Sequence, residues 1–397
     1  MNPTADKPVL LGGKPLFKTP VPITKPTLEA SPELLARMKK TIAGLVVTNA
    51  VHVREFEAEA QSRLKVKHAV AVNSCTTGLI LAMRALGLKG EVLLPSFTFC
   101  ATGHAVLYAG LTPRFVDCDP ETLNIDPALV EKAVNSRTCA VLAVHLFGNP
   151  ADVDALERVA RKHRLKLLFD AAHGIGSQRC GRPLGGSGDA EVFSLSPTKL
   201  LTTGEGGLLT TNDAALTERI RRARNYGIVQ ENDCDMAGVN SRMGELNALL
   251  GLTGWAPLEA RVAHRNRLAQ EYRRALTHIP GITFQRIDPR DRSSFKDFSI
   301  LVEPSLLGLN RDELAAALKL ENVECRKYFY PPLHLQAPYK AYRRGRLPVT
   351  EAATLRTLSL PLYSHMDTRW VPRIAAALER VCRRAADVRA ALKKGGK

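Results

Sequence analysis

Apolar residues in the first part of the chain follow two alternating patterns. Short, nearly continuous apolar runs alternate with longer segments in which apolar residues recur every three or four positions. The runs are typical of strands buried in a parallel sheet, and the longer segments of amphipathic helices. The predicted strands are 69–74, 91–94, 113–116, 139–144, 167–170, 190–195 and 207–211. The predicted helices are 32–43, 53–64, 79–86, 101–108, 127–134, 152–163 and 214–224. This alternation predicts an α/β fold with a parallel sheet and right-handed crossovers.

The pattern changes after a polar loop over residues 226–238. A long helical stretch, residues 242–276, leads into a mixed order of elements. We expect strands at 282–287, 298–302 and 323–328, with helices at 311–318 and 368–388. Such an order predicts a smaller α+β unit.

Three parts follow from these patterns. Residues 1–30 are rich in proline and have little periodicity, so we expect an N-terminal arm that packs along a partner surface or another domain. A large α/β domain is predicted over residues 31–255. A small C-terminal α+β domain is predicted over residues 256–397.

Composition and charge narrow the class of protein. With 397 residues and 45% apolar content, the chain can bury a large core. A net charge of +17 suits an anionic partner, but the basic residues are spread along the chain without the interleaved aromatic residues of a nucleic-acid platform. We therefore expect a solvated basic surface and no nucleic-acid partner. The same charge would attract a phosphorylated substrate.

Cysteine spacing and hydropathy exclude further classes. The eight cysteines form no C-x-x-C pair and no Cys/His cluster at zinc spacing, so we expect reduced thiols and no metal site. The N-terminal residues lack the order of a signal peptide, and no stretch approaches the roughly 18 apolar residues of a membrane span. These observations predict a cytoplasmic enzyme with no membrane partner.

Three polar groups lie at the ends of predicted strands. Lys199 stands in a polar turn before a glycine-rich turn, Asp170 ends an apolar run, and Ser74 to Gly78 leads from a strand into an apolar helix. The carboxyl ends of parallel strands share one edge of a sheet, where ligands bind. A lysine that holds an aldehyde as a Schiff base, a carboxylate beside a protonated ring nitrogen, and backbone N–H groups around a phosphate are what pyridoxal 5′-phosphate (PLP) requires. The set therefore indicates a PLP site.

A series of ordered motifs extends this interpretation. They are Val72-Asn-Ser-Cys-Thr-Thr-Gly-Leu79, Leu94-Pro-Ser-Phe-Thr-Phe99, Thr112-Pro-Arg-Phe-Val-Asp-Cys-Asp119, Val144-His-Leu-Phe-Gly148, Asp170-Ala-Ala-His173, Phe193-Ser-Leu-Ser-Pro-Thr-Lys199, Gly204-Glu-Gly-Gly207 and Gly238-Val-Asn-Ser-Arg-Met243. In this order and spacing the chain resembles the DegT/StrS family of sugar-nucleotide aminotransferases. The resemblance implies the three-layer PLP-transferase fold of the aspartate aminotransferase type, with a mainly parallel central sheet and a smaller α+β C-terminal domain.

The resemblance assigns the catalytic and ring-binding residues. Lys199 would hold the cofactor aldehyde and, once freed, move a proton between the substrate and the cofactor. Asp170 would pair with the pyridinium nitrogen. His173 would lie by the phenolic oxygen, where the family often has glutamine. Phe97 would stack on the cofactor ring; a purely structural place in the core is the alternative.

Further residues are assigned to the phosphate. The resemblance implies that Ser194 binds it and that Ser74, Cys75 and Thr76 supply backbone donors at the start of a helix. Asn240 would reach the phosphate of the neighbouring subunit. We therefore expect a homodimer with shared active sites.

The sequence departs from the family pattern near the substrate. Ser74-Cys-Thr76 replaces the usual Ser-Gly-Thr, a variant that resembles the enzymes aminating C4 of a 6-deoxy sugar. Thr48-Asn49-Ala50 replaces Thr-Asn-Gly, which leaves the backbone geometry of this loop open. The candidate substrate contacts are Thr48, Asn49, Arg242 and His334, and a turn histidine is the alternative for His334.

The resemblance also implies an activity. Lysine at position 199 separates this chain from the dehydratase branch, whose members use no lysine Schiff base. We expect L-glutamate to load the amine, with pyridoxamine 5′-phosphate as the intermediate form, and a nucleoside-diphosphate keto sugar to accept it. C4 of a dTDP-4-keto-6-deoxyhexose is the preferred acceptor. The alternatives are a C3-keto sugar, a uronic-acid derivative, a GDP- or UDP-linked keto sugar, or a non-catalytic PLP-binding regulator.

Overall fold

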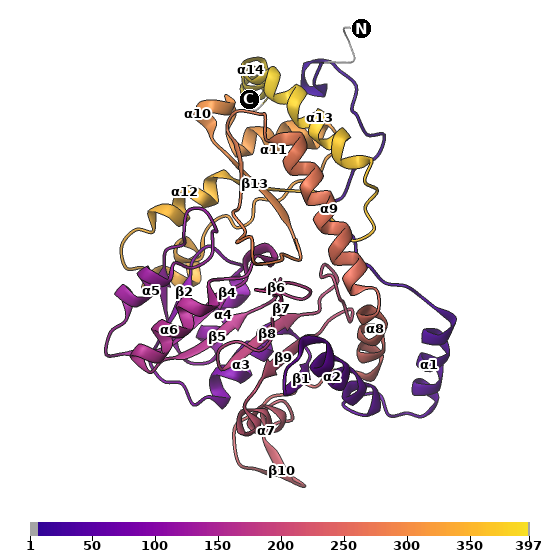
Figure 1. The fold of residues 1–397 in the computed structure, drawn as a ribbon, viewed down its shortest axis with the longest axis vertical. Coiled ribbons are helices and arrows are strands. Elements are labelled where there is room, and N and C mark those ends of the chain that lie inside the picture. Colours follow the sequence, from indigo (N-terminus) through magenta and orange to yellow (C-terminus); the bar gives the residue numbers. More distant parts are fainter. Residues whose placement is uncertain (1–6, 396–397) are drawn as a thin grey trace.

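The central element of the computed structural model, which describes residues 7–395, is a seven-stranded sheet (Figure 1). Its strand order is β1-β9-β8-β5-β4-β2-β3. The strands are β1 (His68–Val72), β2 (Glu91–Pro95), β3 (Thr112–Val116), β4 (Thr138–Val144), β5 (Lys166–Asp170), β8 (Ala190–Ser194) and β9 (Gly207–Thr211). β9 runs antiparallel to both of its neighbours, whereas the other neighbouring strands are parallel. The predicted sheet is therefore confirmed, except that β9 is reversed.

Helices cover both faces of this sheet because its side chains alternate in direction. In β1, Val70 joins one apolar cluster, whereas Ala69 and Ala71 join another. The first face is covered by α3 (Cys75–Ala85), α4 (Cys100–Tyr108) and α7 (Ala214–Ala223). The second is covered by α2 (Val51–Leu64), α5 (Pro127–Ala133), α6 (Val153–His163) and α8 (Glu245–Trp255). The result is a three-layer α/β arrangement.

The C-terminal part has a separate apolar core around an antiparallel sheet of order β12-β13-β14. Its strands are β12 (Ile282–Phe284), β13 (Phe298–Val302) and β14 (Thr357–Leu360). Its helices are α9 (Leu258–Leu276), α10 (Pro304–Leu307), α11 (Arg311–Leu320), α12 (Pro348–Arg356), α13 (Trp370–Arg383) and α14 (Ala385–Gly395). This confirms the predicted α+β character.

Two predicted elements of this part are wrong. Residues 323–328 form no ladder: Val323 bridges to Val21 and Arg326 to Ser359, so β14 is the third strand. The helix predicted over 242–276 is divided into α8 and α9. The division falls at Pro257, whose missing N–H cannot continue the hydrogen bonds of α8.

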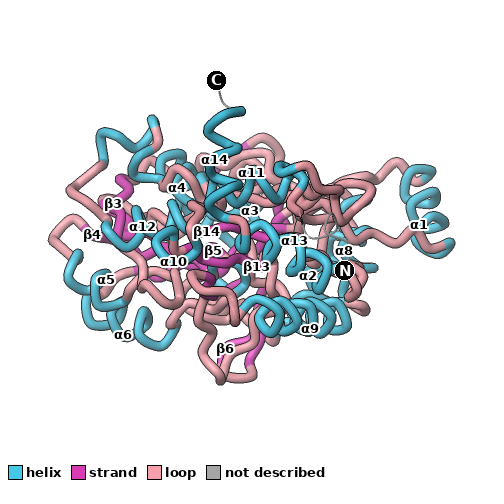
Figure 2. Tube along the Cα trace, turned by 90° about the horizontal axis from the view of Figure 1, so that it is seen from above, coloured by secondary structure: helices cyan, strands magenta, loops and turns pink. Residues whose placement is uncertain are grey.

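The N-terminal residues from Lys7 on pack mainly along the C-terminal part, and residues 1–6 of the predicted arm lie outside the described residues. Phe17 and Val21 are buried in its core, and the Val21 N–H donates to the Asn322 carbonyl at 2.8 Å. The following helix, α1 (Pro32–Ala43), stands at the periphery beside α8 (Figures 1 and 2). The division into an arm and two domains stays a prediction.

Small elements complete the chain. They are the hairpins β6–β7 (Gln178–Arg179, Arg182–Pro183) and β10–β11 (Ile228–Gln230, Asp233–Cys234), and the 3₁₀ helices η1 (Val9–Leu11), η2 (Leu146–Gly148), η3 (Leu333–Leu335) and η4 (Ala337–Tyr342). The β10–β11 hairpin lies inside the segment predicted as a polar loop. To cross a membrane, a helix would have to be longer or more apolar than any within residues 7–395.

Candidate active site

A cavity of about 350 Å³ lies at the carboxyl edge of the central sheet. Seven predicted site residues line it: Ser74, Cys75, Thr76, Asp170, His173, Ser194 and Lys199. We call the lining residues from 74 to 206 the N-terminal wall. The lining residues Lys296, Asp297, Tyr328 and Phe329 form what we call the C-terminal wall. The cavity therefore brings together two parts of the chain that are far apart in the sequence.

The start of α3 forms a cup in the N-terminal wall. Ser74 is its N-cap and accepts a hydrogen bond from the Thr77 N–H at 3.1 Å. The first N–H groups of a helix have no partner within it, so those of Cys75 and Thr76 are suited to bind an anion. Gly207 packs directly against this turn, since a Cβ there would lie 2.5 Å from the Ser74 carbonyl carbon. The lysine-bearing segment and the cup are thus in close contact.

Cys75 occupies the place where a glycine is usual. Its Sγ lies 3.4 Å from the Val192 carbonyl oxygen and 3.9 Å from Asp170 Oδ1. Burial raises the pKa of the Cys75 thiol well above its usual value, and the charge of Asp170 adds to this effect. The extra side chain therefore brings a neutral thiol, not a second negative charge, to the cavity.

Asp170 stands at the end of β5 with its carboxylate held by two donors. Thr102 Oγ1 donates to Oδ2 at 2.7 Å, and the Ala172 N–H donates to Oδ1 at 3.0 Å. Burial raises the pKa of Asp170, while these two hydrogen bonds act in the opposite direction. A fixed, buried carboxylate of this kind can pair with a protonated ring nitrogen.

Lys199 lies in the turn between β8 and β9. The turn is closed by the Thr203 N–H, which donates to the Leu195 carbonyl at 2.9 Å, and by the Lys199 N–H, which donates to Ser196. Burial, and then the charge of Lys296 across the cavity, lower the pKa of Lys199 to about 8. A substantial share of the amine is therefore neutral near pH 8, as a nucleophile requires.

The hydrogen bonds of His173 determine its tautomer. Its Nδ1 accepts from the Phe147 N–H at 3.2 Å, so a neutral ring carries its proton on Nε2. Burial lowers the pKa of His173 well below its usual value, and Lys199 lowers it further. The ring lies nearly parallel to those of Phe147 and Phe329. His173 can therefore offer one N–H donor to a phenolic oxygen.

Phe97 does not line the cavity. It is 1% exposed and packs edge-on against Phe147 and Phe329, at centroid distances of 6.4 and 6.1 Å. Phe99, two residues on at the N-cap of α4, lines the cavity and is 56% exposed. Of the two phenylalanines in this motif, Phe99 is therefore the one that lines the cavity.

His334 is also outside the cavity lining. It is 1% exposed, its Nδ1 lies 2.7 Å from Ser96 Oγ, and its Nε2 lies 3.4 Å from Glu351. Its backbone N–H donates to the same serine. His334 thus fastens the C-terminal part to the end of β2, and its role as a substrate contact stays a prediction.

The other candidate contacts lie beside the cup. Thr48 and Asn49 bond the Met243 carbonyl, Arg242 bonds Asn225, and the Asn240 carbonyl accepts from Asn73 at 3.3 Å. None of Thr48, Asn49, Asn240 and Arg242 lines the described cavity. Asn49 takes the left-handed conformation at φ 50°, whereas φ is −120° at Ala50, so this loop needs no glycine there. The roles of all four residues stay predictions.

The C-terminal wall was missed by sequence reasoning. Lys296 Nζ donates to Asp297 Oδ1 at 2.8 Å, and both side chains are buried. The sequence signal was a pair of opposite charges between Phe295 and Phe298, at the start of a predicted strand. Thr102 and Phe99 were missed as well.

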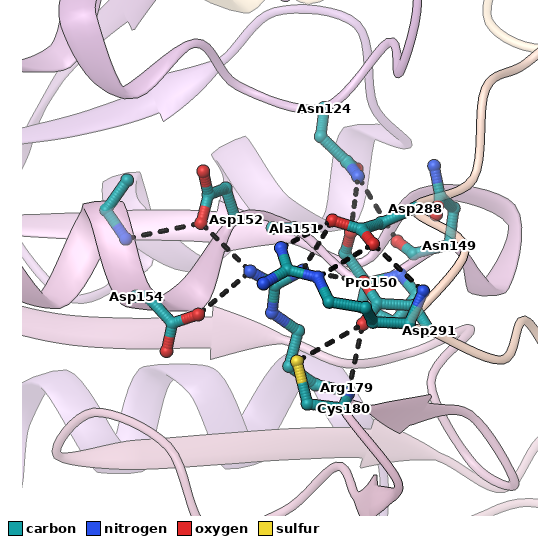
Figure 3. A network of polar contacts seen from close by, with 12 residues as sticks. Asn124, Asn149, Pro150, Ala151, Asp152, Asp154, Arg179, Cys180, Asp288 and Asp291 are labelled. Carbon is teal, nitrogen blue, oxygen red and sulfur yellow. Dashed lines mark hydrogen bonds and ion pairs between the residues drawn. The ribbon is translucent and has the colours of Figure 1, made fainter.

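A polar network outside the cavity anchors the segment that leads to this wall (Figure 3). Arg179, in β6, donates to Asp291 at 2.8 Å and to Asp152 and Asp154 of the α6 region at 3.2 and 2.9 Å. Asp288 lies 3.7 Å away. The guanidinium is the cation that these carboxylates share, and no group of His, Cys, Asp or Glu within residues 7–395 is arranged to hold a metal ion.

The chain is similar to known proteins along most of its length. Residues 29–379 match the model of the DegT/DnrJ/EryC1/StrS aminotransferase family. The chain is 31% identical to the dTDP-4-amino-4,6-dideoxy-D-glucose transaminase of Escherichia coli, over 90% of this chain and 98% of the relative. It is 36% identical to the dTDP-3-amino-3,4,6-trideoxy-alpha-D-glucose transaminase of Streptomyces venezuelae, over 81% and 85%. The crystal structure of DesI in the presence of its TDP-sugar product matches with a TM-score of 0.92 and 36% identity, over 97% and 99% of the two chains.

The family match and the geometry of the cavity indicate the same class of enzyme. The cup, the fixed carboxylate and the lysine fit the phosphate, the ring nitrogen and the aldehyde of PLP, and the predicted PLP-transferase fold is confirmed. The chain belongs to the DegT/DnrJ/EryC1/StrS aminotransferase family, and it is a PLP-dependent sugar-nucleotide aminotransferase.

Proposed function

We propose that this enzyme moves the amino group of L-glutamate to C4 of a dTDP-4-keto-6-deoxyhexose. The observation that carries the proposal is the cavity in which Lys199, Asp170 and the cup at Ser74 meet. The E. coli relative is named for a dTDP-linked 4-amino sugar, and DesI was solved with a TDP-sugar product. Both support a dTDP-linked acceptor.

The roles proposed for the residues follow from their contacts. When bound, PLP supplies an electron sink that stabilises negative charge on the substrate carbon. Lys199, with its pKa lowered to about 8, would hold the aldehyde and would move the proton. Asp170 keeps the ring nitrogen protonated, and His173 donates its Nε2–H to the phenolic oxygen. Ser194 and the α3 cup hold the phosphate.

We propose in addition that the enzyme is a homodimer with shared sites. Asn240 is exposed beside the cup, and the hydrogen bond described for it uses its backbone carbonyl. Its side chain is therefore available to the phosphate site of a second copy. Activity that stays constant per chain when the protein is diluted into monomers would contradict this proposal.

A C3-keto sugar is the second candidate acceptor. The S. venezuelae relative, named for a 3-amino sugar, is 36% identical to this chain, against 31% for the E. coli relative. Overall identity does not separate the two positions, because the loops around the sugar decide it. GDP- and UDP-linked keto sugars are tested as acceptors as well.

The test separates the two half-reactions. The purified holoenzyme is mixed with L-glutamate, and we expect the visible absorbance of bound PLP to be lost as 2-oxoglutarate appears. The amine-loaded enzyme is then offered dTDP-4-keto, dTDP-3-keto, GDP-4-keto and UDP-linked keto sugars in turn. Recovery of the absorbance with the dTDP-4-keto sugar at the highest kcat/KM supports the proposal.

Lys199→Ala is the control and the most severe substitution. Without the amine, both covalent attachment and proton transfer are lost, so we expect turnover to fall by more than roughly 10⁴-fold. The cup remains, so the cofactor still binds non-covalently. Preference for another keto sugar would overturn the C4 assignment, and binding of PLP without any turnover would favour a regulator.

A further inference from the structure

Lys296 and Asp297 are held rigidly in the C-terminal wall. The Lys296 N–H donates to the Phe147 carbonyl at 3.0 Å, and Arg265 Nη1 donates to the carbonyls of Phe295 and Lys296. Phe295 takes the left-handed conformation at φ 44°, which turns the chain just before the pair. Three separate contacts thus determine where the two charged side chains enter the cavity.

The hydrogen bonds of this pair are incomplete. Asp297 Oδ1 accepts from Lys296 Nζ, whereas the buried Oδ2 has no partner among the described residues. Lys296 can donate three hydrogen bonds, and one is accounted for here. A buried carboxylate oxygen without a donor is costly, so a ligand that supplies one is expected at this point.

The need for a hydrogen-bond donor to Asp297 Oδ2 limits which ligand can bind there. The phosphate of PLP is a hydrogen-bond acceptor, its phenolic oxygen is assigned to His173, and neither supplies a donor to Asp297. The carboxylates of an amino-acid donor are acceptors too, and its amino group is taken up by the reaction at the cofactor aldehyde. A sugar hydroxyl both donates and accepts, so it can satisfy Asp297 while a neighbouring sugar oxygen accepts from Lys296.

We propose that Asp297 and Lys296 bind the sugar of the substrate, with Asp297 Oδ2 accepting from the hydroxyl next to the reacting ketone and Lys296 donating to an adjacent oxygen. This inference rests on the proposed function and names a feature of its substrate. For a 4-keto sugar, the hydroxyl is that on C3. The enzyme therefore requires a sugar that keeps this hydroxyl.

The surroundings of the pair strengthen such contacts. Tyr328 and Phe329 line the same wall, and Phe99 lines the cavity near them, with its ring centroid 6.2 Å from that of Phe329. Aromatic walls exclude water, and hydrogen bonds to charged groups are stronger where water is excluded. A site built to bond a substrate hydroxyl rejects the analogue that lacks it by roughly 10⁴-fold, because its polar groups are then unpaired.

The experiment measures binding and one half-reaction. Calorimetry on the holoenzyme compares the dTDP-4-amino-4,6-dideoxyhexose product, its 3-deoxy analogue and dTDP alone, for wild type, Asp297→Asn and Lys296→Met. We expect each substitution to weaken binding of the product by about 10- to 100-fold, the loss of a hydrogen bond to a charged group. Binding of dTDP should change by less than about twofold. The glutamate half-reaction is measured for each variant beside it.

The 3-deoxy analogue gives the more discriminating comparison, because it lacks only the hydroxyl that Asp297 is proposed to bind. Wild type should bind it far more weakly than the hydroxylated product, and Asp297→Asn should bind the two nearly equally. Glu57→Gln is the matched control, because Glu57 and Arg224 form another buried ion pair away from the cavity. That variant should bind the sugar as wild type does, and thermal unfolding shows which variants are folded.

Three results would overturn the inference. One is product binding that is unchanged in both cavity variants, and a second is equal weakening for the product and for dTDP. The third is loss of the glutamate half-reaction with sugar binding intact, which would assign the pair to the amino donor. If wild type converts none of the keto sugars, the proposed function fails, and this inference fails with it.

Discussion

The two walls of the cavity differ in what they do and in how they are built. The N-terminal wall contains the cup, Asp170 and Lys199, and it comes from strand ends of a single sheet. The C-terminal wall contains Lys296 and Asp297, which come from a turn before β13. Both oxygens of Asp170 accept hydrogen bonds from the protein, whereas one oxygen of Asp297 has no described partner.

This difference assigns the reaction chemistry to the N-terminal wall and substrate recognition to the C-terminal wall. A carboxylate whose position is fixed by the protein is already arranged for a cofactor that stays in the site. A carboxylate with an unpaired oxygen is completed by a molecule that enters and leaves. The first wall can therefore be common to enzymes with many substrates, whereas the second is suited to distinguish among them.

The largest effect expected from the N-terminal wall, after the loss of Lys199, is that of Asp170→Asn. The amide cannot stabilise a protonated ring nitrogen, so we expect kcat to fall on the order of 10²–10⁴-fold in both half-reactions. Stopped-flow measurement of each half-reaction tests this. A loss confined to the sugar half-reaction would contradict the division between the walls.

Electrostatic coupling across the cavity gives the next prediction. Burial, and then Lys296, lower the pKa of Lys199 to about 8, so its neutral fraction in the apoenzyme should fall about tenfold per pH unit below pH 8. Competitive acetylation followed by peptide mass spectrometry measures this profile. In Lys296→Met a positive neighbour is removed, so the profile should move to higher pH. An unmoved profile would mean that the walls act independently.

The smallest effect separates two neighbouring phenylalanines. Phe99→Leu should weaken PLP binding by roughly two- to tenfold, the contribution of one aromatic contact, with little change in thermal stability. Phe97→Leu should instead lower the free energy of unfolding by about 1 kcal/mol, because it alters the packed core. Cofactor titration and urea unfolding of both variants test this. The reverse pattern would restore Phe97 as the stacking residue.

The N-terminal wall and its sheet could be predicted from the sequence because local rules determine them. Buried strands are continuous apolar runs, and Ser74, Asp170 and Lys199 stand at the end of such runs or in the turn that follows. What failed depended on contacts between distant residues. The direction of β9 follows from its pairing with β1 and β8, and β14 is identified by its ladder with β13.

The positions of other residues were hard to predict for the same reason. Phe97 and Phe99 are both aromatic residues in one short motif, and both rings lie near that of Phe329. Only the burial of Phe97 in the folded chain separates it from the exposed Phe99. His334 has an ordinary turn sequence around it, but Ser96 bonds it from another part of the chain. Asp297 was missed because an unpaired oxygen is a property of three-dimensional packing.

The Arg179 network has a consequence for protein engineering. It attaches the segment before Lys296 to the α6 region from outside the cavity, with Asp291 and Asp152 as its two ends (Figure 3). The residues that fix the path of the segment are therefore different from those that face the ligand. Lys296 and Asp297 can be exchanged for the residues of another family member while the anchor is kept, which makes this segment a natural unit for altering which amino sugar the enzyme produces.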